Sequence, residues 1–266
     1  MRGGNSVPDR AMNLEVLGCA GGIGGRERLT TCLRVDDDVL LDAGTGLATL
    51  HIEQLAKIDH VFLSHSHLDH VAGLALLVDA VLGKRSYPIT LHATQKVIDA
   101  LKTHLFNWTL WPDFTKIPNE SNPVLQMQPI EHAVTLELGG RRITPYPVNH
   151  TVDAVGYWVR NGVDGFVFSG DMFSTPELWR TLARKKKLSK VIVDCSFPNA
   201  ESDLATLSKH FCPQSLLEDI GAMAPSIEFL IYHLKPGQED LIIEELRSAG
   251  RGRLFSAIKS GDRFIF

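Results

Sequence analysis

The sequence predicts an α/β fold in which two β-sheets pack face to face and helices cover their outer faces. Short apolar runs typical of buried strands alternate with helical patterns, and the series occurs twice, strands first and helices after. The 266 residues are 44% hydrophobic, which is enough apolar material for a large core. No linker or low-complexity segment interrupts the pattern. We therefore expect a flexible leader at residues 1–12 and one domain at residues 13–266.

The first series predicts strands at 13–17, 31–35, 39–41, 60–64 and 88–92, and helices at 47–57, 71–82 and 94–105. The second and third strands form a hairpin across three aspartates at 36–38. The turn at 18–25 holds five glycines but contains neither GxGxxG nor a Gly-Lys-Ser/Thr ending. We therefore expect it to turn tightly or to bring backbone close to a site, and not to bind a nucleotide.

The second series follows an irregular stretch at 106–123 that is rich in aromatic residues and prolines. It predicts strands at 124–130, 134–138, 142–148, 155–160, 163–169, 190–194 and 227–231. It predicts helices at 176–186, 202–210, 213–222 and 237–248.

The composition narrows the classes of function. The net charge of −4 argues against a general nucleic-acid binder, and the basic run 184–187 fits a helix C-terminus. The four cysteines are widely spaced and indicate a reducing compartment, so we expect a cytoplasmic protein. There is no apolar run of about 18 residues, so we expect no membrane span.

The most informative segment is His65-Ser66-His67-Leu68-Asp69-His70, which follows the apolar run 58–64. It offers three imidazoles and a carboxylate within six residues, at the point where a strand ends. Such a donor set suits Zn²⁺, with Mn²⁺ or Fe²⁺ as alternatives. The segment therefore predicts a metal site.

Three further candidate ligands lie at the ends of apolar strands: His150, Asp171 and His233. A histidine at a strand end is commonly a solvated or capping residue. Three such residues beside the first motif favour a shared site instead, since ligands gather where the carboxyl ends of strands converge.

Together with Asp42 in Leu-Asp-Ala-Gly-Thr-Gly, this pattern resembles the metallo-β-lactamase fold superfamily over residues 13–260. The resemblance implies a four-layer αββα sandwich with two divalent metal ions. It implies a first metal held by His65, His67 and His150, a second held by Asp69, His70 and His233, and Asp171 bridging both. Asp42 would orient ligands without binding metal, or would simply form a turn before Gly44. Two metals sharing a hydroxide suit phosphoester cleavage.

Within the superfamily the chain is most similar to the class II 3′,5′-cyclic-nucleotide phosphodiesterases and their bacterial relatives. The similarity lies in the first motif through Leu74, in the aromatic segment 106–114 and in Tyr232-His-Leu-Lys-Pro-Gly. It implies hydrolysis of cAMP or cGMP to 5′-monophosphates by attack of a metal-bridging hydroxide. We expect Asp69 and His210 to be catalytic, with His210 as a general acid. His210 precedes Phe211 and Cys212, however, which departs from the related His-Ser-Thr motif, so it is equally an ordinary helix-end histidine.

The expected substrate is a small phosphodiester. Trp108 and Trp111, with Phe106 and Phe114, offer a wall for base stacking, or else form a lid or a homodimer contact. Lys235 is a candidate contact for a phosphate oxygen, or an exposed lysine that opens a helix. The competing interpretations are a tRNA 3′-processing endonuclease of the ribonuclease Z type, a lactonase or thioesterase, and a non-catalytic sensor.

Overall fold

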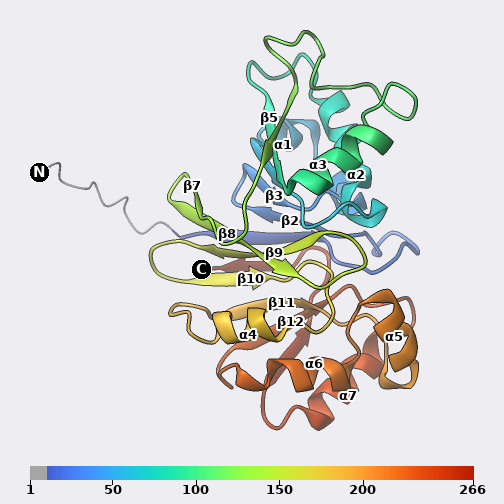
Figure 1. Cartoon of the computed structure of the whole chain (residues 1–266), viewed down its shortest axis with the longest axis vertical. Helices are drawn as coiled ribbons and strands as arrows, with labels where there is room; N and C mark the ends of the chain where they lie inside the picture. Colours follow the sequence, from blue (N-terminus) through green and yellow to red (C-terminus); the bar gives the residue numbers. More distant parts are fainter. Residues whose placement is uncertain (1–10) are drawn as a thin grey trace, which may run out of the picture.

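The computed structural model describes residues 11–266, which form a sandwich of two β-sheets (Figure 1). The first sheet has seven strands in the order β14-β1-β2-β3-β4-β5-β6. β14, β1, β2 and β3 pair antiparallel, whereas β3 to β6 pair in parallel. The bounds of its strands are β1 Asn13–Gly18, β2 Cys32–Val35, β3 Val39–Leu41, β4 His60–Phe62, β5 Ile89–Ala93, β6 Leu125–Pro129 and β14 Arg263–Ile265.

The second sheet repeats this arrangement, with seven strands in the order β13-β12-β11-β10-β9-β8-β7. β7 to β10 pair antiparallel, and β10 to β13 pair in parallel. The bounds of its strands are β7 Leu136–Leu138, β8 Arg141–Val148, β9 Ala154–Arg160, β10 Gly165–Phe168, β11 Lys190–Asp194, β12 Glu228–Tyr232 and β13 Leu254–Ala257.

Helices cover the outer face of each sheet, so the molecule has four layers (Figure 1). The first sheet carries α1 (Ile52–Leu55), α2 (Leu68–Ala80) and α3 (Gln95–His104). The second carries α4 (Pro176–Leu182), α5 (Ser202–Ser208), α6 (Pro213–Asp219) and α7 (Glu239–Ala249). The predicted αββα sandwich is confirmed.

Alternating side chains build the cores on the two faces of each sheet. In β12, Phe229 and Ile231 pack against the helices, whereas Leu230 and Tyr232 pack into the core between the sheets. That central core takes side chains from both sheets. It supports our proposal that residues 13–266 form a single domain.

Two predicted elements need correction, and two further strands are present. The helix expected at 47–57 is wrong: Leu50 and His51 are extended and separate a 3₁₀ turn (Thr45–Thr49) from the single turn of α1. α2 begins at Leu68 and not at residue 71, which brings Asp69 and His70 into its first turn. The sequence predicts neither β13 nor β14, because each is only three or four residues long and neither shows an alternation of apolar and polar residues.

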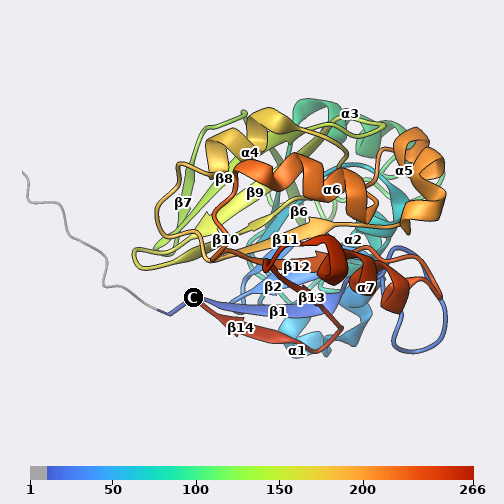
Figure 2. The same ribbon diagram turned by 90° about the horizontal axis from the view of Figure 1, so that it is seen from below.

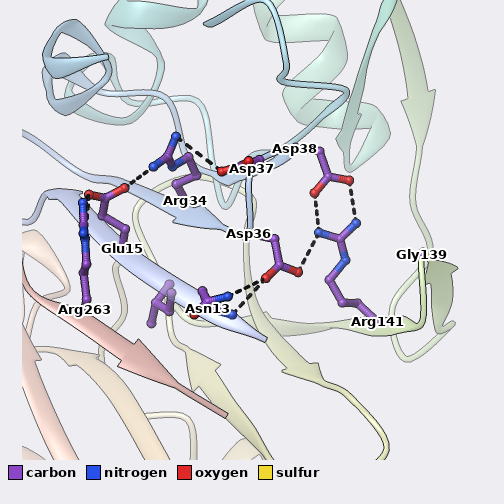
Figure 3. A pocket seen from close by; sticks show the side chains of 10 residues that line it. Asn13, Glu15, Arg34, Asp36, Asp37, Asp38, Gly139, Arg141 and Arg263 are labelled. Atoms are coloured by element: carbon purple, nitrogen blue, oxygen red, sulfur yellow. Dashed lines mark hydrogen bonds and ion pairs between the residues drawn. The ribbon is translucent and has the colours of Figure 1, made fainter. Parts of the chain in front are cut away.

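A network of ion pairs joins the two sheets at the end where β3 begins (Figure 3). Arg141 of the second sheet donates two hydrogen bonds to Asp38 of the first, at 2.5 and 2.6 Å, and a third to Asp36 at 3.3 Å. Glu15 accepts hydrogen bonds from Arg34 and Arg263 beside it. These residues line a cavity of about 560 Å³. Because the three guanidinium groups are all paired with carboxylates, we interpret the network as structural.

The two ends of the described chain meet at β1 and β14, which lie side by side (Figure 2). Met12 is buried and exchanges backbone hydrogen bonds with Phe266, both at 2.9 Å. Met12 is thus part of the packed body, and residues 1–10 of the expected leader lie outside the described residues. Among the helices of residues 11–266, none has both the length and the apolar composition needed to cross a bilayer.

Candidate metal centre

All seven predicted ligands come together at the carboxyl ends of the strands. His65 and His67 follow β4, and Asp69 and His70 lie in the first turn of α2. The other three follow strands of the second sheet: His150 after β8, Asp171 after β10 and His233 after β12. The group therefore lies across the boundary between the two sheets.

Close backbone packing fixes the position of α2. Gly73 donates its N–H to the carbonyl oxygen of Ala43, and Ala43 donates to that of His70, both at 2.7 Å. A Cβ on Gly73 would lie 2.7 Å from the carbonyl oxygen of Gly44, which is too close for any side chain. The loop after β3 thereby holds the first turn of α2 against the cluster.

The first ligand group consists of His65, His67 and His150, whose ligand atoms lie within 4.8 Å of one another. His67 Nδ1 faces His150 Nε2 at 3.2 Å. His150 Nδ1 donates to the carbonyl oxygen of Lys209 at 3.1 Å, which leaves its Nε2 lone pair directed at the group. Burial lowers the pKa of His150 to about 4, so this imidazole is neutral at neutral pH, as a metal ligand must be.

The second group consists of Asp69, His70, Asp171 and His233. Asp171 Oδ2 lies 3.2 Å from Nε2 of both His70 and His233, and 3.8 Å from Nε2 of His65. Its Oδ1 accepts a hydrogen bond from the Tyr232 hydroxyl at 3.0 Å. One carboxylate oxygen is therefore turned toward ligands of both groups.

The electrostatics of the cluster favour a cation. Burial raises the pKa of Asp171, but His233 and His70 lower it by more, so it stays well below its ordinary value. Burial lowers the pKa of His70, yet Asp171 and Asp42 raise it well above its ordinary value. The carboxylates thus favour positive charge at the cluster.

Two buried nitrogens support a metal at this place. Nε2 of His65 and Nε2 of His70 make no hydrogen bond of good geometry, although His70 Nε2 lies 3.2 Å from Asp171 Oδ2. Buried polar atoms are almost always paired, so each unpaired one needs an explanation. Both atoms face the cluster, where a borderline-soft metal would satisfy them. The residues present fit the implied divalent metals.

Asp42 orients one of these ligands from behind. It is completely buried and accepts a hydrogen bond from His70 Nδ1 at 2.6 Å. It also accepts from the backbone N–H and the hydroxyl of Ser64, both at 2.7 Å. With Nδ1 committed to Asp42, His70 presents Nε2 to the cluster.

His210 lies against the cluster and has a partner that sequence reasoning missed. Its ring stacks on that of His233, with centroids 4.9 Å apart and planes 15° apart. Its Nδ1 donates to Asp194 Oδ2 at 2.6 Å. Burial lowers the pKa of His210, but Asp194 raises it by more, and the net shift is upward. Asp194 ends the apolar strand β11 just as Asp171 follows β10, so the signal was present in the sequence.

The glycine-rich turn at 18–25 holds the backbone around His233 in place. His233 donates its N–H to the Cys19 carbonyl oxygen at 2.8 Å, and Gly21 donates to that of Leu234 at 3.2 Å. A Cβ on Gly21 would lie 2.2 Å from the His233 carbonyl oxygen, so this position requires glycine. The turn brings backbone near the cluster, as expected.

The candidate substrate contacts lie in different surroundings. Lys235 Nζ donates to the Gly21 carbonyl oxygen at 2.9 Å. Trp108 is 62% exposed, and Trp111 packs against the core of the first sheet. Within residues 11–266, neither ring stacks on or hydrogen-bonds to a predicted ligand. The expected stacking wall does not include Phe106 and Phe114, because both side chains are buried in the same core.

Comparisons with known proteins agree with this geometry. Residues 38–236 match a β-lactamase superfamily domain, a range that includes all seven candidate ligands. The chain is 31% identical over 228 residues to a 3′,5′-cyclic-nucleotide phosphodiesterase of Schizosaccharomyces pombe. This match covers 72% of the chain and 63% of the relative, so the chain spans less than two thirds of that protein.

Solved structures show the same fold. The unliganded yeast PDE1 superposes with a TM-score of 0.82 at 19% identity, covering 96% of this chain and 99% of that one. The metallo-β-lactamase fold protein YhfI from Bacillus subtilis gives 0.77 at 20% identity, covering 97% and 100%. The chain belongs to the β-lactamase superfamily, and its fold is that of the metallo-β-lactamases.

Proposed function

We propose that the protein is a dinuclear metal-dependent phosphodiesterase that hydrolyses 3′,5′-cyclic nucleotides to 5′-monophosphates. The observation that carries this proposal is the place of Asp171 Oδ2, 3.2 Å from two imidazole nitrogens of one group and 3.8 Å from one of the other. The name of the Schizosaccharomyces pombe relative supports the substrate class.

His65, His67 and His150 would hold one metal, and Asp69, His70 and His233 the other, with Asp171 shared. The mixture of imidazole and carboxylate donors suits Zn²⁺ first, and Mn²⁺ or Fe²⁺ next. Bound together, two such ions polarise the phosphoryl oxygens and bring the pKa of a water toward neutrality. Asp69 would supply one of the two carboxylates that hold the ions, which is its expected part in catalysis.

His210 would serve the departing 3′-oxygen. Its Nδ1 proton is held by Asp194, so Nε2 is the atom free to carry a proton toward the substrate. The raised pKa of His210, which Asp194 produces against the effect of burial, keeps that proton in place near neutral pH. A proton given to the leaving oxygen from Nε2 would prevent a free alkoxide from forming.

Phosphorus NMR of the products tests the proposal directly. Zinc- or manganese-loaded protein is incubated with 3′,5′-cyclic AMP, and the His67→Ala variant serves as the control. We expect 5′-AMP, formed only by the intact site. Formation of 3′-AMP would contradict cleavage at the 3′-oxygen. Absence of turnover, together with cleavage of precursor tRNA or of a lactone, would establish one of the competing hydrolase activities instead.

A further inference from the structure

Two buried serines occupy equivalent places in the two sheets. β4 and β11 are each the fifth strand of their sheet, counted from β14 and from β7. Ser64 lies two residues beyond the end of β4, and Ser196 two residues beyond the end of β11. Both side chains are completely buried. Each sheet therefore delivers a hydroxyl group to the back of the cluster.

Ser64 connects His65 to Asp42. Its Oγ lies 2.7 Å from Asp42 Oδ2 and 2.9 Å from His65 Nδ1. A hydroxyl has a single hydrogen, and an ionised carboxylate can only accept. Ser64 must then donate to Asp42, and His65 Nδ1–H must donate to Ser64. This leaves the lone pair of His65 on Nε2, the buried nitrogen without a partner.

Ser196 connects His233 to Asp194 in the same way. Its Oγ lies 2.7 Å from Asp194 Oδ1, 3.0 Å from the His233 carbonyl oxygen and 2.9 Å from His233 Nδ1. The single hydroxyl hydrogen goes to one of the two oxygens, and charge favours the carboxylate. In either case His233 Nδ1 must be the donor, so a neutral His233 has its lone pair on Nε2, which lies 3.1 Å from Asp69 Oδ2 and 3.2 Å from Asp171 Oδ2.

The two carboxylates are used alike. Asp42 accepts a hydrogen bond from His70 directly, at 2.6 Å. It is connected to His65 through the hydroxyl group of Ser64. Asp194 accepts a hydrogen bond from His210 directly, at 2.6 Å. It is connected to His233 through the hydroxyl group of Ser196. Each buried aspartate thus orients two imidazole rings, one by a direct hydrogen bond and one through a serine hydroxyl group.

We propose that Ser64 and Ser196 are paired positioning residues, each fixing the Nδ1–H tautomer of one ligand in a different metal position. Ser64 acts on the His65, His67, His150 position, and Ser196 acts on the Asp69, His70, His233 position. The inference rests on the proposed dinuclear site, but not on the substrate. Replacing either serine with alanine keeps the aspartate and its direct imidazole and removes only the hydroxyl connection.

Zinc occupancy under limiting metal tests the pairing. Crystals of Ser64→Ala and Ser196→Ala are grown with one zinc per chain, and anomalous scattering gives the occupancy of each position. In Ser64→Ala we expect zinc mainly at the position that His233 helps to form. In Ser196→Ala we expect zinc mainly at the position that His65 helps to form. Competition with a chelator should show a loss of about 10–100-fold in affinity at the affected position, as is usual when a ligand loses its orienting partner.

Two further variants make the test specific. Ser189→Ala removes a hydroxyl that donates to Asp164 at 2.8 Å without any histidine, and it should bind zinc like the wild type. Ser64→Thr and Ser196→Thr keep the hydroxyl and should recover most of the affinity. Circular dichroism establishes that each variant is folded.

The outcomes separate the two proposals. Wild-type affinity and occupancy in both alanine variants, or an equal loss at both positions in each, would overturn the serine pairing. Wild-type protein that binds no zinc would overturn the dinuclear site and the pairing with it. Protein that binds two zinc ions but leaves cyclic AMP intact would overturn the substrate and leave the pairing supported.

Discussion

His210 gains a chemical role from its neighbours and not from a motif. In the sequence it is one histidine after a helix, followed by Phe211 and Cys212. In the structure Asp194 holds its Nδ1 at 2.6 Å, and its ring lies flat against that of His233. An imidazole held in this way can present a proton at one defined atom beside the cluster.

The first prediction concerns that proton. His210→Ala should lower kcat for cyclic AMP by about 10²–10⁴-fold with a much smaller change in KM, because general acid catalysis acts on the chemical step. Steady-state kinetics measures the effect, with the exposed His132→Ala as the control. A change in kcat of less than about threefold would exclude the acid role.

The second prediction concerns the pH dependence of kcat. Asp194 raises the pKa of His210 against the effect of burial, so the protonated form persists above its ordinary pKa near 6.5. Activity that needs this proton is present below the raised pKa and is lost as pH rises through it. Asp194→Asn should therefore move the alkaline limb of the profile to lower pH. An unmoved limb would mean that another group sets it.

Residues of the centre differ in how far the sequence could reveal them. The candidate ligands stood out because three of them follow apolar strands in a chain that also contains the His65-Ser66-His67-Leu68-Asp69-His70 segment. Asp194 carries the same signal, but it lies outside the metal motifs and so was not selected. Ser64 and Ser196 carry none, since serine is common in loops and only the distances of 2.7 to 2.9 Å reveal their partners.

At the scale of elements, α2 depends on how closely its first turns approach the loop after β3. Asp69 and His70 have the correct position only if Gly73 can lie against Ala43 and Gly44. Helix propensity alone would favour alanine over glycine by about 1 kcal/mol. Packing decides the residue here, and packing between distant segments is what sequence patterns describe least well.

The third prediction follows from this contact. Gly73→Ala should lower both the melting temperature and the zinc affinity, because a Cβ would lie 2.7 and 2.9 Å from two backbone oxygens and must push α2 away. Calorimetry and zinc titration measure the two effects. Gly221→Ala, whose Cβ would meet nothing within 4 Å, should change neither. Unchanged zinc affinity in Gly73→Ala would show that α2 moves without its ligands.

The fourth prediction concerns the ion pairs that join β8 to the β2–β3 hairpin. Arg141→Met should destabilise the fold by about 1–3 kcal/mol, because it leaves the half-buried Asp38 carboxylate without its two hydrogen bonds. Urea denaturation measures this free energy of unfolding. Arg142→Met breaks the exposed pair with Glu137 and should cost less than about 1 kcal/mol. Equal costs would show that Arg141 gains nothing from burial.

Helices and strands are predicted best where the local sequence pattern is strong. The apolar runs that became β10, β11 and β12 are buried throughout or nearly so, and they were placed correctly. The helix expected at 47–57 failed because the segment has apolar residues at helical spacing, yet Leu50 and His51 are held extended. β14 could not be found because it pairs with β1, almost the whole chain away.

At the scale of the molecule, the candidate metal centre lies across the two halves of the sandwich. The first ligand group takes two residues from the first sheet and His150 from the second; the second group takes two residues from each. Metal bound there would add a connection between the two halves beside their shared apolar core and the Arg141 network. The four-layer architecture was predictable because the strand and helix pattern occurs twice.

The fifth prediction is that metal stabilises the whole fold. Removing metal with a chelator should lower the melting temperature, and zinc should restore it, because the folded state alone presents the complete ligand set. Zinc at 100 times its dissociation constant corresponds to about 2.7 kcal/mol for one site. Differential scanning calorimetry measures the shift, and Asp171→Asn should reduce it. A melting temperature indifferent to metal would mean that the ligands are not used together.

The pairing of β14 with β1 has a consequence for synthesis on the ribosome. β1 is made long before β14, so its outer edge stays open until residues 263–265 are made. An open strand edge is a template for pairing with other chains. Until β14 is made, the outer edge of β1 therefore presents unpaired backbone N–H and C=O groups.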